Sequence, residues 1–273
     1  MRMVPIRRRN PDRSRVAKHY RKEEKKMLEL RNISFEVEAD GDDKEIIHDI
    51  SLTIPDKKLV VITGPNGGGK STLAKLIAGI EKPTKGSILL DGTDITNMSV
   101  TDRAKAGIGF AFQQPVRFKG IEVFDLIRLA TGTKMSVADA CEYLSAVGLC
   151  AHDYINREVN SSLSGGELKR IEIATVLAKK SKFSIFDEPE AGIDLWSFNN
   201  LIEVFEGMRK DIKDSSIVII SHQERILAIA DEVIVIKDGE LYMQGPGEEI
   251  LPKLAGTASA IKGCGKGMPM ALE

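Results

Sequence analysis

The pattern of apolar and polar positions divides the chain into two kinds of sequence. Residues 28–38 and 46–54 alternate between apolar and polar side chains, which predicts two half-exposed strands joined by a charged turn at 40–44. Farther along, short and almost wholly apolar runs predict buried strands with helices between them. These runs are 60–63, 183–186, 217–220 and 233–236. A short strand at 241–243 and a helix at 245–254 are expected to follow them.

Buried strands that alternate with helices predict an α/β fold with a parallel sheet covered on both faces. Helices are expected at about 71–79 and from about residues 195 and 224. Residues of about 116–180 interrupt this order, because they hold helical patterns and no convincing strand. The patterns are 123–130, 137–147 and 167–178, the last with Leu168, Ile171 and Ala178 on one stripe. We therefore expect a helical lobe inserted into the α/β core.

The composition is that of an ordinary protein with a packed core. Of the 273 residues, 42% are hydrophobic and 29% are charged, which excludes collagen-like, disulfide-rich and wholly disordered chains. We expect neither a membrane-spanning segment nor a signal peptide, because every apolar run is short. Cys141, Cys150 and Cys264 show no metal-ligand spacing, which suits a cytoplasmic protein. Cys141 and Cys150 are expected to be small packing residues, and Cys264 a thiol on a solvated tail.

The net charge of −1 conceals a basic segment attached to an acidic one. Residues 1–26 carry 11 Lys and Arg against 3 Asp and Glu, a net charge of +8, whereas the remaining residues carry 28 against 37, a net charge of −9. Segment 1–26 is expected to be disordered alone, and the Gly-rich tail 255–273 to be mobile. The basic segment suggests a nucleic-acid or membrane contact. The alternatives are an extension without an enzymatic role, or a start assigned at Met1 instead of Met27.

A glycine-rich loop between a buried strand and a helix is the strongest chemical signal in the chain. It fits the pattern G-x-x-x-x-G-K-[ST], in which glycines let backbone amides turn toward phosphate oxygens and the helix N-terminus adds partial positive charge. We expect Lys70 to reach the β- and γ-phosphates of a nucleotide, and the Ser71 hydroxyl to bind Mg²⁺. The loop comprises Gly64, Pro65, Asn66, Gly67, Gly68, Gly69, Lys70 and Ser71, and Thr72 follows in the helix. A tight glycine turn without a ligand is the alternative.

Two acidic residues follow the apolar run 183–186. In open parallel sheets, ligands lie beyond the carboxyl ends of the strands. Asp187 is therefore placed to complete the Mg²⁺ shell, and Glu188 to polarise a water molecule for attack on the γ-phosphate. The alternative is an acidic loop before Pro189 that has no role in catalysis.

Residues 163–167 read Leu-Ser-Gly-Gly-Glu and precede the predicted helix at 167–178. The first amides of a helix can bind an anion, so this segment is a candidate for a second phosphate-binding site. The candidate residues are Ser164, Gly165, Gly166 and Glu167. The alternative is structural, because a serine followed three residues later by a glutamate is also a helix capping box. The presence of the other motifs favours the binding interpretation.

In order and spacing, these motifs resemble those of the ATP-binding cassette (ABC) ATPases over nearly all of residues 27–254. The phosphate loop corresponds to the Walker A motif, 163–167 to the signature and 183–188 to the Walker B motif. The resemblance implies that Gln113 lies in the Q-loop, where it contacts Mg²⁺ and the attacking water. It also implies that His222 is the switch histidine, which senses the γ-phosphate. A purely structural histidine is the alternative for His222.

The resemblance further implies an architecture and an assembly. Members of this family have a RecA-like parallel sheet, an N-terminal antiparallel β subdomain and an inserted helical lobe, and they hydrolyse ATP with Mg²⁺. Two cassettes dimerise head to tail when ATP is bound, so that Ser164 and Gly165 of one copy serve the nucleotide of the other. Ala191–Asp194 resembles the D-loop of the family.

Several details resemble SufC, the ATPase of Suf-type iron–sulfur cluster assembly. They are Phe112–Val116 with Gly120, Glu167 where transporters more often have glutamine, Gly192 in the D-loop, and Ser221–Leu227. Lys57-Lys58 and Glu190-Ala191 depart from the family's usual residues. The resemblance implies that a SufB-like scaffold, with or without a SufD-like subunit, binds near residues 113–120, and that nucleic acid is not contacted directly.

The main alternative is the ATP-binding subunit of an ABC membrane transporter, which is the commonest role in the family and would place the chain at a membrane. An ATPase that acts on nucleic acid is a third class, suggested only by segment 1–26. The other histidines, His19, His48 and His152, lack a comparable context. We expect them to be surface or packing residues.

Overall fold

Strands of two β-sheets lie next to the predicted phosphate loop. The computed structural model describes residues 26–39, 42–160, 162–210, 212 and 215–254. One sheet has the strand order β2-β1-β4-β5 with antiparallel pairing throughout, as predicted for an N-terminal β subdomain. Its strands are β1 (Lys26–Ala39), β2 (Asp42–Pro55), β4 (Lys85–Leu90) and β5 (Thr93–Asp94).

The second sheet has the strand order β10-β9-β3-β8-β7-β6. All its neighbouring strands are parallel except β10, which pairs with β9 in the antiparallel sense. Its strands are β3 (Leu59–Thr63), β6 (Ile108–Ala111), β7 (Phe183–Asp187), β8 (Ser216–Ile220), β9 (Glu232–Lys237) and β10 (Glu240–Pro246). This sheet confirms the predicted parallel core, because the four apolar runs form its strands β3, β7, β8 and β9.

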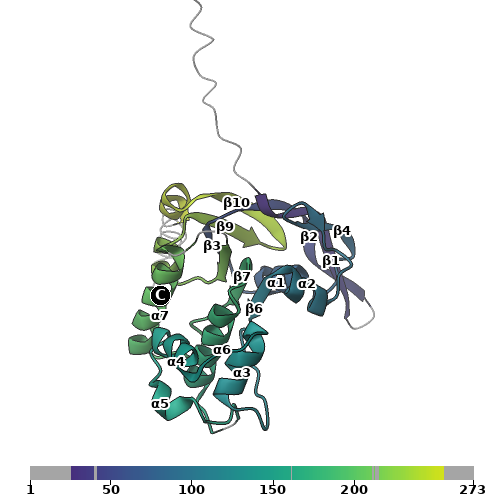
Figure 1. Cartoon of the computed structure of the whole chain (residues 1–273). Coiled ribbons are helices and arrows are strands. Elements are labelled where there is room, and N and C mark those ends of the chain that lie inside the picture. The colour runs from purple at the N-terminus through teal and green to yellow at the C-terminus, as the bar shows by residue number, and fades with distance from the viewer. Residues whose placement is uncertain (1–25, 40–41, 161, 211, 213–214, 255–273) are drawn as a thin grey trace, which may run out of the picture.

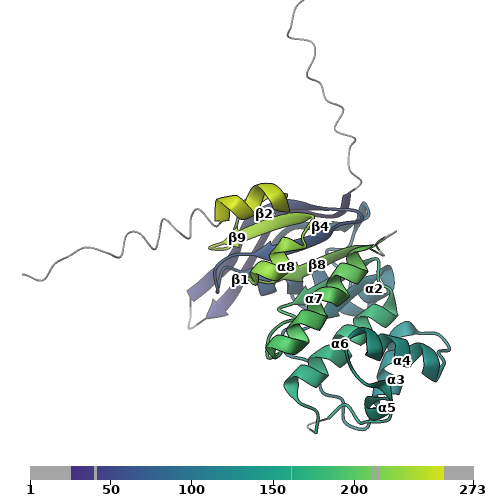
Figure 2. The same ribbon diagram turned by 90° about the vertical axis from the view of Figure 1, so that its left-hand side faces the viewer.

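The helices fall into two groups. Helices α3, α4, α5 and α6 form a lobe whose far end points away from both sheets, as Figures 1 and 2 show. Helices α1, α2, α7 and α8 lie nearer the sheets. Their bounds are α1 (Lys70–Ala78), α2 (Val100–Ala106), α3 (Val123–Thr131), α4 (Val137–Ala146), α5 (Ala151–Tyr154), α6 (Gly165–Lys179), α7 (Leu195–Lys210) and α8 (Glu224–Ala228). The lobe is the inserted helical segment predicted from the sequence.

The parallel sheet is covered on both faces, which explains why the central positions of β3, β8 and β9 are apolar. On β3, Leu59 and Val61 belong to a cluster of buried residues that includes side chains of α3, α4, α6 and α7. The alternate residues, Val60 and Ile62, belong to a second cluster that includes side chains of β1, β2 and α1. No helix in the described part of the chain is both long and apolar enough to cross a bilayer.

Some sequence-based element boundaries were wrong. The helix expected at 245–254 begins at residue 247, because Gly245 and Pro246 still pair with β9 as part of β10. The turn expected at 40–44 is shorter, since β2 already begins at Asp42. Strands β4, β5 and β6 and helix α2 were not predicted from the sequence. Segment 1–25, the tail and Cys264 lie outside the described residues.

The single apolar stripe predicted for 167–178 was also wrong. Leu168, Ile171 and Ala178 are buried as expected, but Lys169 and Ile173, which lie off that stripe, are fully buried as well. Helix α6 packs against α3, α4 and β6, so it is enclosed on several sides and cannot show one simple apolar face.

Candidate functional site

The predicted phosphate loop runs from the end of β3 to the first turn of α1. Gly69 is the N-cap residue of α1, and no side chain caps the first amides of the helix. The amides therefore remain open to an anion, as the binding interpretation requires. Within the loop, the Gly68 N–H donates to the carbonyl oxygen of Pro65 at 3.2 Å.

Two glycines of the loop are required by close backbone packing as well as by conformation. A Cβ at Gly64, whose φ is 137°, would lie 1.9 Å from the carbonyl oxygen of Ile236 in β9. A Cβ at Gly69, whose φ is 94°, would lie 2.7 Å from Cδ1 of Ile47 in β2. Glycine tolerates such conformations without a steric penalty. The loop is thus wedged between one strand of each sheet.

Lys70 points back into the loop. Its Nζ donates to the carbonyl oxygens of Gly64 at 2.9 Å and Pro65 at 2.8 Å, and only 5% of the residue's surface is exposed. Burial lowers the pKa of Lys70, and the nearby carboxylates of Glu188 and Asp187 oppose this shift. The ammonium group therefore lies inside the loop that is predicted to surround phosphate.

Asp187 and Ser71 meet although 116 residues separate them in the sequence. Asp187 is the last residue of β7, and its Oδ1 accepts a hydrogen bond from Ser71 Oγ at 2.9 Å. Only 2% of Asp187 is exposed, and this burial raises the pKa of its carboxyl group, while the Ser71 hydrogen bond counteracts the rise. The two predicted metal ligands are thus adjacent.

Gln113 and Glu188 form a second contact at the same edge. Gln113 follows β6, and its Nε2 donates to Glu188 Oε2 at 2.7 Å. Glu188 has a φ of 44°, and its backbone N–H donates to the carbonyl oxygen of Ile220 at 3.0 Å. A non-glycine residue held at positive φ is a feature that clusters at functional sites. The carboxylate of Glu188 is partly exposed, so water can reach it.

His222 follows β8 and is exposed. The preceding residue, Ser221, donates a hydrogen bond from its Oγ to Glu190 Oε1 at 2.5 Å. Burial raises the pKa of Glu190, and the hydrogen bond from Ser221 and the charge of His222 lower it, which places His222 near that carboxyl group. Residues after β3, β6, β7 and β8 therefore gather at the carboxyl ends of the parallel strands, the edge where ligands of such sheets bind.

The signature segment has the structure of a capping box. Ser164 Oγ accepts a hydrogen bond from the Glu167 N–H at 3.2 Å, and the Ser164 N–H donates to Glu167 Oε2 at 2.6 Å. The hydroxyl of Tyr154 donates to Glu167 Oε1. This bond and that from Ser164 lower the pKa of Glu167 to about 2. The capping box that was the alternative interpretation of this segment is therefore present. Ser164 and Gly165 are nevertheless exposed, as contact with a second copy would require.

The positions of Lys169 and Glu172 were not predicted from the sequence. Lys169 has no exposed surface, and its Nζ lies 3.3 Å from Glu172 Oε2. Burial lowers the pKa of Lys169 and raises that of Glu172, and each charge opposes the shift of the other. The only signal in the sequence is a Lys and a Glu three residues apart, interleaved with the apolar Leu168 and Ile171.

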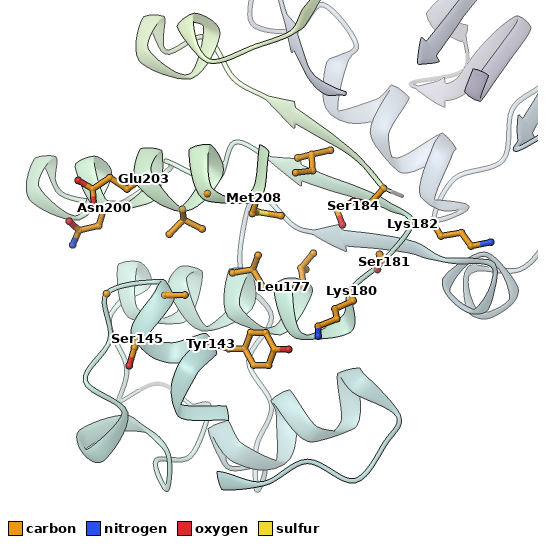
Figure 3. A pocket seen from close by; sticks show the side chains of 17 residues that line it. Tyr143, Ser145, Leu177, Lys180, Ser181, Lys182, Ser184, Asn200, Glu203 and Met208 are labelled. Carbon is orange, nitrogen blue, oxygen red and sulfur yellow. The ribbon is translucent and has the colours of Figure 1, made fainter. Parts of the chain in front are cut away.

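A cavity of about 1050 Å³ lies between α4, α6 and α7, away from this edge. Figure 3 shows Asn200 and Glu203 of α7 at one end of the cavity, with Leu177 and Met208 between the helices. None of the predicted nucleotide-site residues lines it. The candidate site is therefore the open edge of the parallel sheet and not this cavity.

Two further histidines and two cysteines lie in the described part of the chain, whereas His19 and Cys264 lie outside it. His48 Nδ1 lies 2.9 Å from Glu45 Oε2, and the side chain of His152 is 95% exposed, so both lie at the surface as expected. Cys141 is half-buried against the core of the lobe, which agrees with a packing role. Cys150 is exposed at the start of α5, so the packing prediction was wrong for this residue.

Comparison with known proteins identifies the family. The model of the family described as ABC transporter matches residues 47–191. The chain belongs to this family. An uncharacterized ABC transporter ATP-binding protein of Methanocaldococcus jannaschii is 38% identical over 76% of this chain and 85% of its own length. A probable ATP-dependent transporter of Cyanophora paradoxa is 32% identical over 83% of this chain and 91% of its own length.

Solved structures of ABC cassettes share the fold. The dimeric post-hydrolysis state of an ATP-binding cassette bound to ADP and Pi has a TM-score of 0.73 at 23% identity, covering 81% of this chain and 98% of that one. A subunit of an ABC transporter complex of Clostridium perfringens has a TM-score of 0.68 at 27% identity, covering 85% and 92%. The predicted ABC cassette fold, with a P-loop in a mixed α/β core, is thus confirmed.

The protein is therefore an ATP-binding subunit of the ABC type, from a family whose general activity is ATP hydrolysis. The relatives named above are called transporters or transport-type ATP-binding proteins. These names agree with the transporter alternative better than with the Suf interpretation, which stays a prediction.

Proposed function

We propose that this cassette binds ATP together with Mg²⁺ and hydrolyses it at the edge where β3, β6, β7 and β8 end. The observation that carries the proposal is a pair of hydrogen bonds that join four residues from three motifs, the phosphate loop, the Q-loop and the Walker B segment. Ser71 contacts Asp187 at 2.9 Å, and Gln113 contacts Glu188 at 2.7 Å. A phosphate loop, a buried carboxylate and a partly exposed carboxylate together supply what phosphoryl transfer to water needs.

The side chains at this edge fit Mg²⁺. The Ser71 hydroxyl, the Asp187 carboxylate and the side-chain carbonyl of Gln113 are hard oxygen donors, which Mg²⁺ prefers, and Ser71 and Asp187 are already in contact. We assign these three residues to the metal ion. When bound, the ion neutralises charge on the β- and γ-phosphate oxygens.

The chain's own groups account for the rest of the reaction. The amides at the start of α1 and the Lys70 ammonium bind the phosphates and stabilise the negative charge. Glu188 accepts a proton from a water molecule while the oxygen of that water attacks the γ-phosphorus. The bond between the γ-phosphorus and the oxygen that bridges it to the β-phosphate breaks in the same step. His222 donates a hydrogen bond to the γ-phosphate, so that it responds when this group is lost. Products are ADP and inorganic phosphate.

The proposal includes a head-to-tail homodimer that forms with ATP. Ser164 and Gly165 are exposed at the start of α6, where their backbone groups can approach the γ-phosphate held by a second copy. A structurally similar cassette is dimeric with ADP and Pi bound, which supports the same arrangement. In the dimer, each nucleotide would be bound by the phosphate loop of one copy and the signature segment of the other.

Glu188→Gln tests the assignment of the base. The amide keeps the size of the side chain but cannot accept the proton, so ATP binds with unchanged affinity while turnover falls by about 10²–10⁴-fold. Glu203→Gln, on the exposed surface of α7, is the matched control and retains full turnover. ATP binding by equilibrium titration and phosphate release in Mg²⁺ or EDTA provide the measurements. Undiminished turnover in Glu188→Gln would refute the assigned base.

We infer that ATP hydrolysis drives a membrane transporter, since relatives from several organisms bear transport names. One of them is an Fe(3+) ions import ATP-binding protein of Photobacterium profundum, 32% identical over 76% of this chain and 59% of its own length. The second candidate is a Suf ATPase, favoured by the sequences Phe112–Val116 and Ser221–Leu227.

Co-purification of the tagged chain from its native cells separates the two candidates. A membrane-spanning permease in the eluate, with the cassette in the membrane fraction, supports the transporter. A SufB-like scaffold without a permease contradicts it and supports the Suf interpretation. In both cases we place the partner near residues 113–120 of the helical lobe, where Val116 and Phe118 are exposed apolar residues.

A further inference from the structure

Lys169 is fully buried, yet the proposed mechanism gives it no task. Its Nζ donates to the carbonyl oxygen of Phe112 and lies 3.4 Å from that of Gln113. It also lies 3.5 Å from the carbonyl oxygen of Asp187. A buried ammonium group is tolerated only where acceptors surround it. These acceptors belong to the two segments that carry the proposed catalytic residues.

Glu172 completes the same contact from one turn farther along α6. Its Oε1 accepts a hydrogen bond from the Phe112 N–H at 2.9 Å, and its Oε2 lies 3.3 Å from Lys169 Nζ. The backbone of Phe112 is thus held at both its N–H and its C=O by one buried ion pair. Gln113 is the next residue, and its side chain reaches Glu188 at 2.7 Å.

We propose that Lys169 and Glu172 are positioning residues for ATP hydrolysis. By holding the backbone of Phe112, the pair sets the direction in which the chain leaves β6, and therefore where the Gln113 side chain lies. Because Lys169 also contacts the Asp187 carbonyl, it fixes residues 112–113 relative to the end of β7. The inference rests on the proposed function, because it concerns the same site.

The pair also connects this edge to the signature. Lys169 lies at the start of the second turn of α6, and the exposed Ser164 caps the first turn of the same helix. A small rigid-body shift of α6 therefore moves the Lys169 ammonium against the Gln113 segment. Contact between a second copy and Ser164 would thus act on the first copy's own Gln113.

The double variant Lys169→Met/Glu172→Gln removes both charges and leaves no buried charge unpaired. Lys179→Met is the matched control, because Lys179 lies on the same helix and its Nζ donates to a backbone carbonyl of β6, that of Ile108, at 2.7 Å. We expect the double variant to lose about 10²-fold in kcat, the effect of misplacing a catalytic group by about 1 Å, with KM for ATP unchanged. The control keeps the wild-type kcat, whatever stability it loses.

A mutant cycle that combines the double variant with Gln113→Ala tests whether the Lys169–Glu172 pair acts through Gln113. In a Gln113→Ala background, introducing the double variant should lower kcat no further, because the group that the pair positions is already gone. Losses that multiply, or equal losses of kcat in the double variant and in Lys179→Met, would overturn the proposal.

Hydrogen exchange gives a readout that does not require hydrolysis. Without nucleotide, the amides of residues 112–114 should exchange at least tenfold faster in the double variant than in the wild type or in Lys179→Met. The reason is that Lys169→Met removes the donor to the Phe112 and Gln113 carbonyls, and a neutral amide replaces the charged acceptor of the Phe112 N–H. Equal exchange in all three proteins would refute the positioning role. If the wild type hydrolyses no ATP, the proposed function fails, and the exchange experiment still decides the role of the pair.

Discussion

Replacing Glu167 by glutamine tests how the start of α6 is stabilised, at a residue where transporters more often carry glutamine. Both carboxylate oxygens of Glu167 accept hydrogen bonds, one from the Tyr154 hydroxyl and one from the Ser164 N–H. These bonds lower the pKa of Glu167 from its ordinary value of 4.5 to about 2. Glutamine keeps the length of the side chain but has one acceptor oxygen and no charge.

The lowered pKa translates into a stability difference. A pKa change of one corresponds to ~1.4 kcal/mol, so the folded state gains about 3 kcal/mol from the ionised carboxylate at neutral pH. The side chain of Glu167 is 20% exposed, so solvent screens part of this effect and about 3 kcal/mol is its upper bound. Because the pKa is lower in the folded state, the stabilisation is present above pH 4.5 and is lost as the pH falls toward 2.

Urea unfolding followed by circular dichroism from pH 7 to pH 3 measures this effect. The free energy of unfolding of Glu167→Gln should lie up to about 3 kcal/mol below that of the wild type at pH 7, and this difference should narrow below pH 4.5. Tyr154→Phe removes the interaction that lowers the pKa of Glu167 most. Its free energy of unfolding should therefore lie below that of the wild type by a smaller amount at pH 7, and this difference should disappear over the same pH range. A gap that is the same at pH 7 and pH 3 would refute the electrostatic explanation.

Two further predictions concern the phosphate loop and the helix behind it. Gly64→Ala should abolish binding of a fluorescent ATP analogue, because the new Cβ would collide with the Ile236 carbonyl, whereas Gly67→Ala meets no atom within 4 Å and should lose only about 1 kcal/mol of stability from its φ of 77°. Equal binding by both variants would contradict this. Arg103→Met leaves the carbonyl groups of Leu76, Ile77 and Thr96 without the guanidinium that donates to them. The free energy of unfolding in urea should therefore fall by about 3 kcal/mol. A variant as stable as the wild type would show that these hydrogen bonds contribute nothing.

The site was predictable where its chemistry follows from a contiguous pattern. The sequence of the loop from Gly64 to Ser71 predicts phosphate binding, because its glycines, its lysine and its hydroxyl group follow one another in the order that this function needs. The meeting of Ser71 with Asp187 followed from a topological rule, since the carboxyl ends of parallel strands share one edge. Both inferences use local sequence and the order of elements, which a single chain reveals.

Features that depend on packing between distant elements were not predictable. Lys169 looks like a surface lysine in the sequence, and it is buried only because α6 is enclosed by α3, α4 and β6. The same enclosure defeated the single-stripe prediction for this helix. Strand β6 was missed because it is four residues long and contains Gly109, so its extended conformation depends on pairing with β7.

The position of the phosphate loop at the junction of the two sheets has a consequence for fragments of this protein. Gly69 packs against Ile47 of β2, and the His48 N–H donates to Gly239, whose own N–H donates to Gly68. The antiparallel sheet is therefore part of the wall that shapes the loop. A fragment beginning after β2 would retain every residue of the Walker and signature motifs and still lack a formed nucleotide site. Intact motifs therefore do not guarantee that ATP binds.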